Sequence, residues 1–338
     1  METQKIILNE QRNVTLVTMV QKVGGEFKEI TERPAVLILP GGGYAMCSDR
    51  EAEPVAYGFL NAGYQVFILR YSLQENAIWP NPLDDYEQAM ELIKKNADIW
   101  HVCTKRIAVV GFSAGGHLAL CAATMAKNRP NAAIVGYPAV TKDICDMCKP
   151  NLPYPHEEVD ELTCPCFLFA ARDDNVVPIN NLITMQKALS DNGVMFESHI
   201  YSYGGHGFST AQDWLLEGKR TPRLMSWQKE SIEWLNEVWG SFTANGFTEA
   251  KFGRLVNGNK EPYFSVRCTL NYLFENSAKI DCIAMELSLV KQLLSGFSKT
   301  TQESLGSLFR LEDVLPLLGI KEGRIEEIDE KLKGIKNE

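Results

Sequence analysis

Residues 106–117 read RIAVVGFSAGGH and contain the most informative pattern in the chain. The apolar run before Gly111 predicts a buried strand, and the residues after Ser113 predict a helix. The G-x-S-x-G pattern between them is typical of a tight strand-to-helix turn, where side chains at the two flanking glycines would clash. Such a turn holds Ser113 above the carboxyl edge of the sheet, over the positive end of the helix dipole. The alternative is a glycine-rich helix start that this serine caps.

The sequence on both sides of this turn alternates short apolar runs with longer amphipathic segments. This alternation predicts an α/β fold with a mostly parallel, doubly wound sheet. Residues 5–29 alternate polar and apolar types around Gly24 and Gly25, which predicts an antiparallel hairpin at one sheet edge. We expect strands at Ala35–Leu39, Gln65–Tyr71, Arg106–Val110, Ala132–Tyr137, Cys166–Ala170 and Met195–Tyr201, and helices at Asp49–Ala62, Leu83–Asn96, Ala114–Lys127, Asn180–Asp191 and Ser226–Trp239.

The pattern changes after Gly240. Residues 241–258 are rich in Gly, Asn and Thr, which predicts a linker. Apolar residues at helical spacing then predict helices at Thr269–Phe274, Ile283–Leu294, Leu305–Leu311 and Arg324–Leu332. We therefore expect an α/β domain over residues 1–245 and a small helical module over residues 246–338.

Composition and charge restrict the partners of the chain. Its 43 acidic and 34 basic residues give a formal net charge of −9, so no basic face is available for a nucleic acid. No segment reaches the eighteen or so apolar residues needed to cross a bilayer, and the first ten residues do not resemble a secretory signal. We expect a cytoplasmic protein with a small-molecule substrate and no membrane partner. The sequence leaves homo-oligomer formation open.

Nine cysteines are scattered through the chain, unlike the framework of a small secreted domain. We expect most of them to be reduced. Cys145, Cys148, Cys164 and Cys166 could offer four thiolates to zinc. Cys166 also opens an apolar run, where cysteine is a common small core residue. We favour the core interpretation and predict no metal and no cofactor.

A serine hydroxyl becomes an effective nucleophile when a base takes its proton as it attacks. His206 lies in the glycine-rich stretch 203–208, directly after the last predicted strand and at the edge where Ser113 projects. We predict His206 as this base; the alternative is a solvent-exposed turn histidine. The other four histidines are less well placed: His101 and His156 lie in loops, His117 one helical turn after Ser113, and His199 inside a strand.

The base needs a carboxylate that fixes its tautomer and stabilises the imidazolium. The strand ending near residue 171 leads into Asp173 and Asp174, between Ser113 and His206 in the chain. Both aspartates are candidates, and we favour Asp174. The other aspartate is then expected to cap a turn or a helix.

Residues 40–44, PGGGY, follow the first predicted parallel strand. Their backbone amides can approach a substrate where a Cβ atom would obstruct it. We assign the amides of Gly42, Gly43 and Ala114 to an oxyanion hole, which stabilises the charge that develops on a substrate oxygen. Three glycines alone could equally form a flexible turn or a phosphate loop, but no G-K-[ST] follows here.

These motifs together resemble the α/β-hydrolase superfamily, in the esterase branch related to hormone-sensitive lipase. The likeness covers roughly residues 30–240 and is greatest to the bacterial acetyl-xylan-esterase-like carbohydrate esterases. The matching motifs are PGGGY at residues 40–44, GFSAGGH at 111–117, D-x-x-V-P at 174–178 and G-x-H-G at 204–207. The cysteine-rich loop 145–166 departs from the group. Residues 249–338 weakly resemble helical modules appended to some bacterial carbohydrate-active enzymes.

This resemblance implies an α/β-hydrolase fold and hydrolysis of small acyl esters, typically acetate on a sugar or a xylo-oligosaccharide. The catalytic residues would be Ser113, Asp174 and His206. Segments that end near the same sheet edge suggest pocket walls formed by Tyr44, Trp79, His117 and Tyr137. Two other interpretations are a peptidase of the same fold and a non-catalytic hydrolase-like binding protein.

Overall fold

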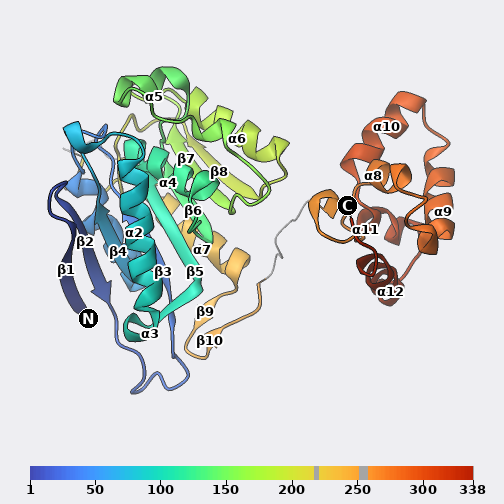
Figure 1. Cartoon of the computed structure of the whole chain (residues 1–338), viewed down its shortest axis with the longest axis horizontal. Coiled ribbons are helices and arrows are strands. Elements are labelled where there is room, and N and C mark those ends of the chain that lie inside the picture. Colours follow the sequence, from blue (N-terminus) through green and yellow to red (C-terminus); the bar gives the residue numbers. More distant parts are fainter. Residues whose placement is uncertain (217–220, 251–257, 338) are drawn as a thin grey trace. The chain divides into compact units, whose positions relative to one another are not determined.

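The computed structural model describes residues 1–216, 221–250 and 258–337 (Figure 1). The chain divides into two compact units, Met1–Arg254 and Leu255–Glu338, and each has a hydrophobic core of its own. The boundary predicted after residue 245 falls slightly earlier than this division. The division itself lies in a segment outside the described residues.

The first unit is built on one eight-stranded sheet with the order β1-β2-β4-β3-β5-β6-β7-β8. The β1–β2 and β2–β4 pairs are antiparallel, and all other neighbours are parallel. The predicted mostly parallel, doubly wound sheet is therefore confirmed. Its strands are β1 (Glu2–Asn9), β2 (Val14–Val20), β3 (Arg33–Leu39), β4 (Gln65–Arg70), β5 (Val102–Phe112), β6 (Ala132–Gly136), β7 (Cys166–Ala171) and β8 (Phe196–Tyr201).

Helices connect the parallel strands and cover both faces of the sheet. Figure 1 shows α2 and α4 in front of the sheet and α7 behind it. Helix α2 packs against α4, and α1 packs against α7. The α-helices are α1 (Glu53–Asn61), α2 (Asn81–Lys95), α3 (Ala97–Trp100), α4 (Ser113–Met125), α5 (Lys142–Cys148), α6 (Asn180–Asp191) and α7 (Ser226–Trp239). Short 3-10 helices are η1 (Asp49–Glu51), η2 (Gln74–Asn76), η3 (Pro155–Glu157) and η4 (Pro222–Met225).

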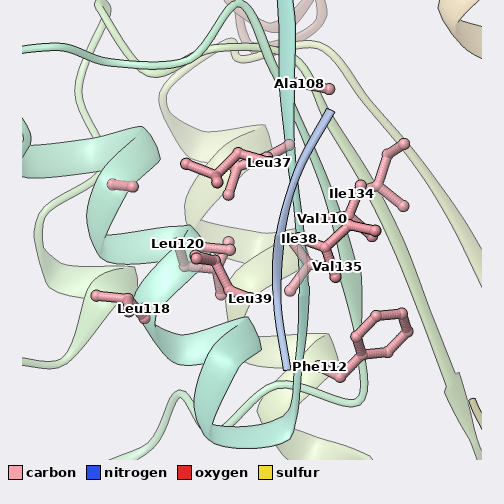
Figure 2. Packing of buried hydrophobic residues seen from close by; sticks show 14 of the residues in the cluster. Leu37, Ile38, Leu39, Ala108, Val110, Phe112, Leu118, Leu120, Ile134 and Val135 are labelled. Atoms are coloured by element: carbon pink, nitrogen blue, oxygen red, sulfur yellow. The ribbon is translucent and has the colours of Figure 1, made fainter. Parts of the chain in front are cut away.

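The core of this unit lies between the central strands and the helices. Every residue of β3, β6 and β7 is buried. Strands covered on both faces read as continuous apolar runs, as they do here. Figure 2 shows Leu37 and Leu39 of β3 on the side that carries Leu120 of α4. This packing fixes the ends of β3 and β5, from which two of the predicted functional segments leave the sheet.

The predicted amino-terminal hairpin exists, but its turn was placed wrongly. Strands β1 and β2 pair around residues 10–13, not around Gly24 and Gly25. The Asn9 side chain accepts a hydrogen bond from the Arg12 amide, and Asn13 has a φ of 54°. Asparagine tolerates this left-handed conformation better than most residues. The two glycines form a separate small turn after β2, and the hairpin does lie at the sheet edge.

The predicted linker 241–258 is not a linker throughout. Strands β9 (Phe242–Thr243) and β10 (Gly246–Phe247) form a small hairpin. The guanidinium of Arg106 lies 3.9 Å from the ring centroid of Phe247, and that of Arg33 lies 5.7 Å from the Phe242 ring. These cation–π contacts attach the hairpin to the first unit. Residues 251–257 of the predicted linker lie outside the described residues.

The second unit is helical, as expected. Its α-helices are α8 (Leu270–Glu275), α9 (Ala284–Leu294), α10 (Lys299–Leu308), α11 (Leu311–Val314) and α12 (Glu322–Lys333), with 3-10 helices η5 (Gly258–Lys260), η6 (Asp281–Ile283) and η7 (Pro316–Leu318). The single helix predicted at residues 305–311 is wrong. Phe309 and Arg310 are extended, because Phe309 accepts a hydrogen bond from the Leu270 amide and Arg310 pairs with Thr269.

Across the described ranges, we find no helix with both the length and the apolar character that a membrane span requires.

Candidate active site

The turn between β5 and α4 places Ser113 at the end of the sheet. Strand β5 ends at Phe112, α4 begins at Ser113, and the φ of Ser113 is 51°. A Cβ atom on Gly111 would lie 2.3 Å from the Gly115 carbonyl oxygen, and one on Gly115 would lie 2.1 Å from the Leu39 carbonyl oxygen. Both positions therefore require glycine, and the strained serine conformation is imposed by the surrounding packing.

Ser113, His206 and Asp174 form a continuous chain of hydrogen bonds. The His206 Nε2 atom lies 2.9 Å from the Ser113 Oγ atom, and its Nδ1 atom lies 2.7 Å from Asp174 Oδ2. The Asp174 side chain is fully buried. Its other oxygen accepts hydrogen bonds of 2.9 Å from the amides of Val176 and Val177. The carboxylate thus accepts a hydrogen bond from the Nδ1–H group, which leaves Nε2 free to accept the serine proton.

The neighbouring aspartate has a different role. Asp173 Oδ1 accepts hydrogen bonds from the amides of Gly204 and Gly205 at 2.9 and 3.0 Å. It therefore holds the glycine-rich loop that carries His206 and does not contact the imidazole itself. The structure separates the two candidates that the sequence left open, because one carboxylate faces the ring and the other faces the loop backbone.

The predicted oxyanion loop lies directly beside Ser113. A Cβ atom on Gly41 would come within 2.9 Å of the Ser113 Cβ atom. Gly42 and Gly43 have φ values of 132° and 61°, and a Cβ atom on Gly42 would lie 2.3 Å from the Met46 carbonyl oxygen. Among the described residues, neither the Gly42 nor the Gly43 amide donates to a protein acceptor. The Ala114 amide, next to Ser113, belongs to the first turn of α4, where amides lack helical partners.

Three buried side chains hold this loop in place. The Tyr71 hydroxyl donates to the Pro40 carbonyl at 2.6 Å, and the Gly41 amide donates to Glu51 Oε2 at 2.8 Å. The hydroxyl of Tyr44 donates to His117 Nδ1 at 2.8 Å. Sequence reasoning missed Glu51 because a single glutamate in an amphipathic segment looks like an ordinary surface residue. It placed Tyr71 only as the last residue of a predicted strand.

Three of the four predicted pocket residues do not line a cleft. Tyr44, His117 and Tyr137 are at most 1% exposed. The prediction assumed that residues at the ends of strands reach the surface, but here the ring of Tyr137 lies under His206, with centroids 5.0 Å apart. Trp79 is partly buried against His117, and its contact with a substrate stays a prediction.

An open cleft of about 590 Å³ lies beside His206. His206 is on its wall, and its side chain is 16% exposed. Asp173, the other candidate carboxylate, also lines it, and the lining residues that the sequence did not suggest are Arg50, Asn175, Val176, Tyr203, Leu215, Leu216 and Thr221.

The four cysteines proposed as an alternative zinc site do not assemble a metal centre. The structure places no group of three or more His, Cys, Asp or Glu side chains in a metal-binding arrangement within its described ranges. The Cys166 thiol donates to the Cys164 carbonyl at 3.2 Å, and Cys145 is fully buried. Burial raises the pKa of the Cys145 thiol, and the neighbouring Cys164 side chain together with burial raises that of Cys166. Both effects oppose the thiolate form that zinc requires.

His117 is a neutral, buried histidine. Its Nε2 atom donates to the Pro153 carbonyl at 2.9 Å, so Nδ1 is the acceptor for Tyr44. Burial lowers the pKa of His117 from 6.5 to about 4. The unfolded chain therefore binds a proton near pH 6.5 that the folded chain does not bind until about pH 4. Stability is fully present above pH 6.5 and is lost as the pH falls toward 4.

We expect His117→Gln to remove this part of the pH dependence. Between pH 7.5 and pH 5, the free energy of unfolding of the wild type should fall by about 2 kcal/mol more than that of the variant. Urea unfolding followed by tryptophan fluorescence measures this, because all six tryptophans lie in the first unit. An equal pH dependence in both proteins would contradict the assignment.

Comparison with solved structures identifies the fold. An α/β-hydrolase from a Medee basin deep-sea metagenome is 40% identical, with a TM-score of 0.66, and the match covers 70% of this chain and 97% of that one. The chain belongs to the α/β-hydrolase superfamily. An acetyl ester-xyloside bifunctional hydrolase from Caldicellulosiruptor lactoaceticus is 26% identical to this α/β-hydrolase, with a TM-score of 0.61 and coverage of 70% and 95%.

Sequence comparisons agree with this result. The family model described as BD-FAE matches residues 26–142. Residues of this α/β-hydrolase are 30% identical to endo-1,4-beta-xylanase B of Butyrivibrio fibrisolvens, over 55% of this chain and 34% of that protein. They are 29% identical to an acetylxylan esterase of Xylanibacter ruminicola, over 58% of this chain and 45% of that protein. The alignments thus span only about a third to a half of these curated relatives. The resemblance found from the motifs and the predicted hydrolase fold are confirmed.

Proposed function

We propose that this α/β-hydrolase is a serine carboxylesterase that cleaves small acyl esters. The hydrogen-bonded chain from Ser113 through His206 to Asp174 is the observation that carries the proposal. It supplies a nucleophile, a general base and an orienting carboxylate in one continuous arrangement. The names of similar proteins, which include an acetylxylan esterase and an acetyl ester-xyloside hydrolase, support ester chemistry.

The proposed reaction has two halves. Ser113 attacks the ester carbonyl while His206 takes its proton, and the amides of Gly42, Gly43 and Ala114 bind the oxyanion. Collapse of the tetrahedral intermediate breaks the ester bond, and His206 returns the proton to the leaving alcohol. Water then attacks the acyl-enzyme in the same way and releases the acid and free Ser113.

We propose acetyl groups on sugars or xylo-oligosaccharides as the substrate class. This choice rests on the acetylated carbohydrate substrates that the names of two similar proteins indicate. A triad by itself specifies acyl transfer and neither the alcohol nor the acyl group.

The first test compares p-nitrophenyl acetate, butyrate and octanoate with acetylated xylo-oligosaccharides and peptide p-nitroanilides. We expect hydrolysis of the acetate, a fall in kcat/KM with longer acyl chains, and release of acetate from the oligosaccharides. A fluorophosphonate should label the tryptic peptide that contains Ser113, as detected by mass spectrometry. Cleavage of the anilides without ester hydrolysis would favour the peptidase alternative, and inertness toward all these reagents would favour the non-catalytic one.

A further inference from the structure

Glu51 is a buried carboxylate that the triad mechanism does not use. It is the last residue of η1 and only 3% exposed. Its two oxygens accept separate hydrogen bonds, Oε2 from the Gly41 amide at 2.8 Å and Oε1 from the Tyr137 hydroxyl at 2.6 Å. A carboxylate in such a place is costly unless it serves the structure or the chemistry.

The directions of these hydrogen bonds define the charge of Glu51. The Ser209 amide donates to the Tyr137 oxygen at 3.0 Å, so the Tyr137 proton must point to Glu51. The Gly41 amide is also an obligate donor. Both Glu51 oxygens therefore act as acceptors, which is the pattern of an ionised carboxylate. Burial raises the pKa of Glu51, and the two hydrogen bonds oppose that effect.

Glu51 joins two segments that are far apart in the chain. On one side it holds the Gly41 amide, where the oxyanion loop begins. On the other side it reaches Ser209, three residues after His206, through Tyr137. The Ser209 hydroxyl also donates to the carbonyl of Arg50, directly before Glu51. The oxyanion loop and the histidine loop thus share one buried anchor.

We propose that Glu51 is a positioning residue of the active site, whose anionic carboxylate couples the oxyanion loop to the histidine loop and favours the imidazolium of His206. This inference rests on the proposed esterase function. Glu51 is buried and both of its oxygens are hydrogen-bonded within the protein, so its contribution is to hold the oxyanion donors and the base in their relative positions. The negative charge acts in the step in which His206 takes the serine proton.

Other groups near His206 must be held constant. Asp174 bonds its Nδ1 atom, and the Tyr137 ring packs against the imidazole. Arg50 and Asp173 line the same cleft, and the positive charge of Arg50 also lowers the pKa of Glu51. Glu51→Gln removes one charge and leaves the charges of Asp174, Arg50 and Asp173 in place.

Glu51→Gln tests the proposal with little change in shape. Its amide nitrogen must face either the Gly41 amide or the Tyr137 hydroxyl, and each of these is already a donor. We expect kcat for p-nitrophenyl acetate to fall about 10- to 100-fold with KM changed less than about threefold, because the reacting groups lose their alignment. The acid limb of the kcat/KM profile should move about half a pH unit or more to lower pH, since a nearby anion is lost.

Two further variants make the result decisive. Glu53→Gln removes a carboxylate two residues away that pairs with Arg70 at 3.6 Å, and it should leave kcat and the acid limb unchanged. Tyr137→Phe breaks the link to Ser209 but keeps the charge, so kcat should fall while the acid limb stays in place. If Glu51→Gln does not fold, as judged by circular dichroism, Tyr137→Phe decides the positioning claim.

The outcomes separate this inference from the proposed function. An active wild type with wild-type kcat and acid limb in Glu51→Gln would overturn the inference and leave the esterase intact. A fall in kcat without a shift of the acid limb would reduce Glu51 to a structural role. A wild type that hydrolyses no ester would overturn both.

Discussion

Replacement of Ser113 by alanine should lower kcat for p-nitrophenyl acetate about a millionfold. The variant keeps the loops and the oxyanion amides but lacks the oxygen that attacks the ester. His206 then has no hydroxyl to deprotonate, and no acyl-enzyme can form. A stopped assay with high enzyme concentration measures the residual rate, and mass spectrometry measures the loss of fluorophosphonate labelling.

A serine on the edge strand provides the control for this experiment. Ser198→Ala removes a hydroxyl in β8 that bonds the Gln186 side chain, and it should leave kcat within about twofold. If Ser113→Ala retained more than a few per cent of the wild-type rate, the acyl-enzyme mechanism would have to be abandoned.

Replacement of Asp174 by asparagine should lower kcat about ten-thousandfold. The Asp174 carboxylate accepts hydrogen bonds from the His206 Nδ1–H group and from two backbone amides at once. An asparagine can turn its NH₂ group toward Nδ1, which places the imidazole proton on Nε2. In that tautomer His206 cannot accept the proton of Ser113.

Asp173→Asn is a matched control in the adjacent position. The asparagine oxygen can still accept from the amides of Gly204 and Gly205, so we expect kcat to fall less than about tenfold. Steady-state kinetics of the two variants, prepared in parallel, gives the comparison. A larger loss in Asp173→Asn than in Asp174→Asn would reverse the assignment of the two carboxylates.

The glycine pattern explains why much of this site could be predicted. A Cβ atom at Gly111 or Gly115 would overlap backbone oxygens. Only glycine fits at these two positions, so the turn can be recognised from the sequence. His206 was predictable because a glycine-rich loop follows the last strand of a parallel sheet, whose carboxyl ends share one edge. The first signal follows from backbone sterics over a few residues, and the second from the order of strands along the chain.

Errors arose where a side chain's environment comes from distant segments. Tyr44, His117 and Tyr137 were expected on a pocket wall, but all three are buried and hydrogen-bond to residues far away in the chain. The hairpin turn was assigned to Gly24 and Gly25 because glycine is the usual turn signal, whereas asparagine chemistry near residue 13 makes the turn.

The sequence by itself determined the alternating α/β order of the first unit, the helical character of the second and the turn that presents Ser113. These features depend on periodicity and on steric limits that act over a few residues. Only the tertiary structure decided which aspartate faces His206 and that Glu51 anchors two loops. Those roles depend on the His206–Asp174 and Tyr137–Glu51 hydrogen bonds, which join residues 32 and 86 positions apart. The direction of such a bond is set by packing that no local pattern encodes.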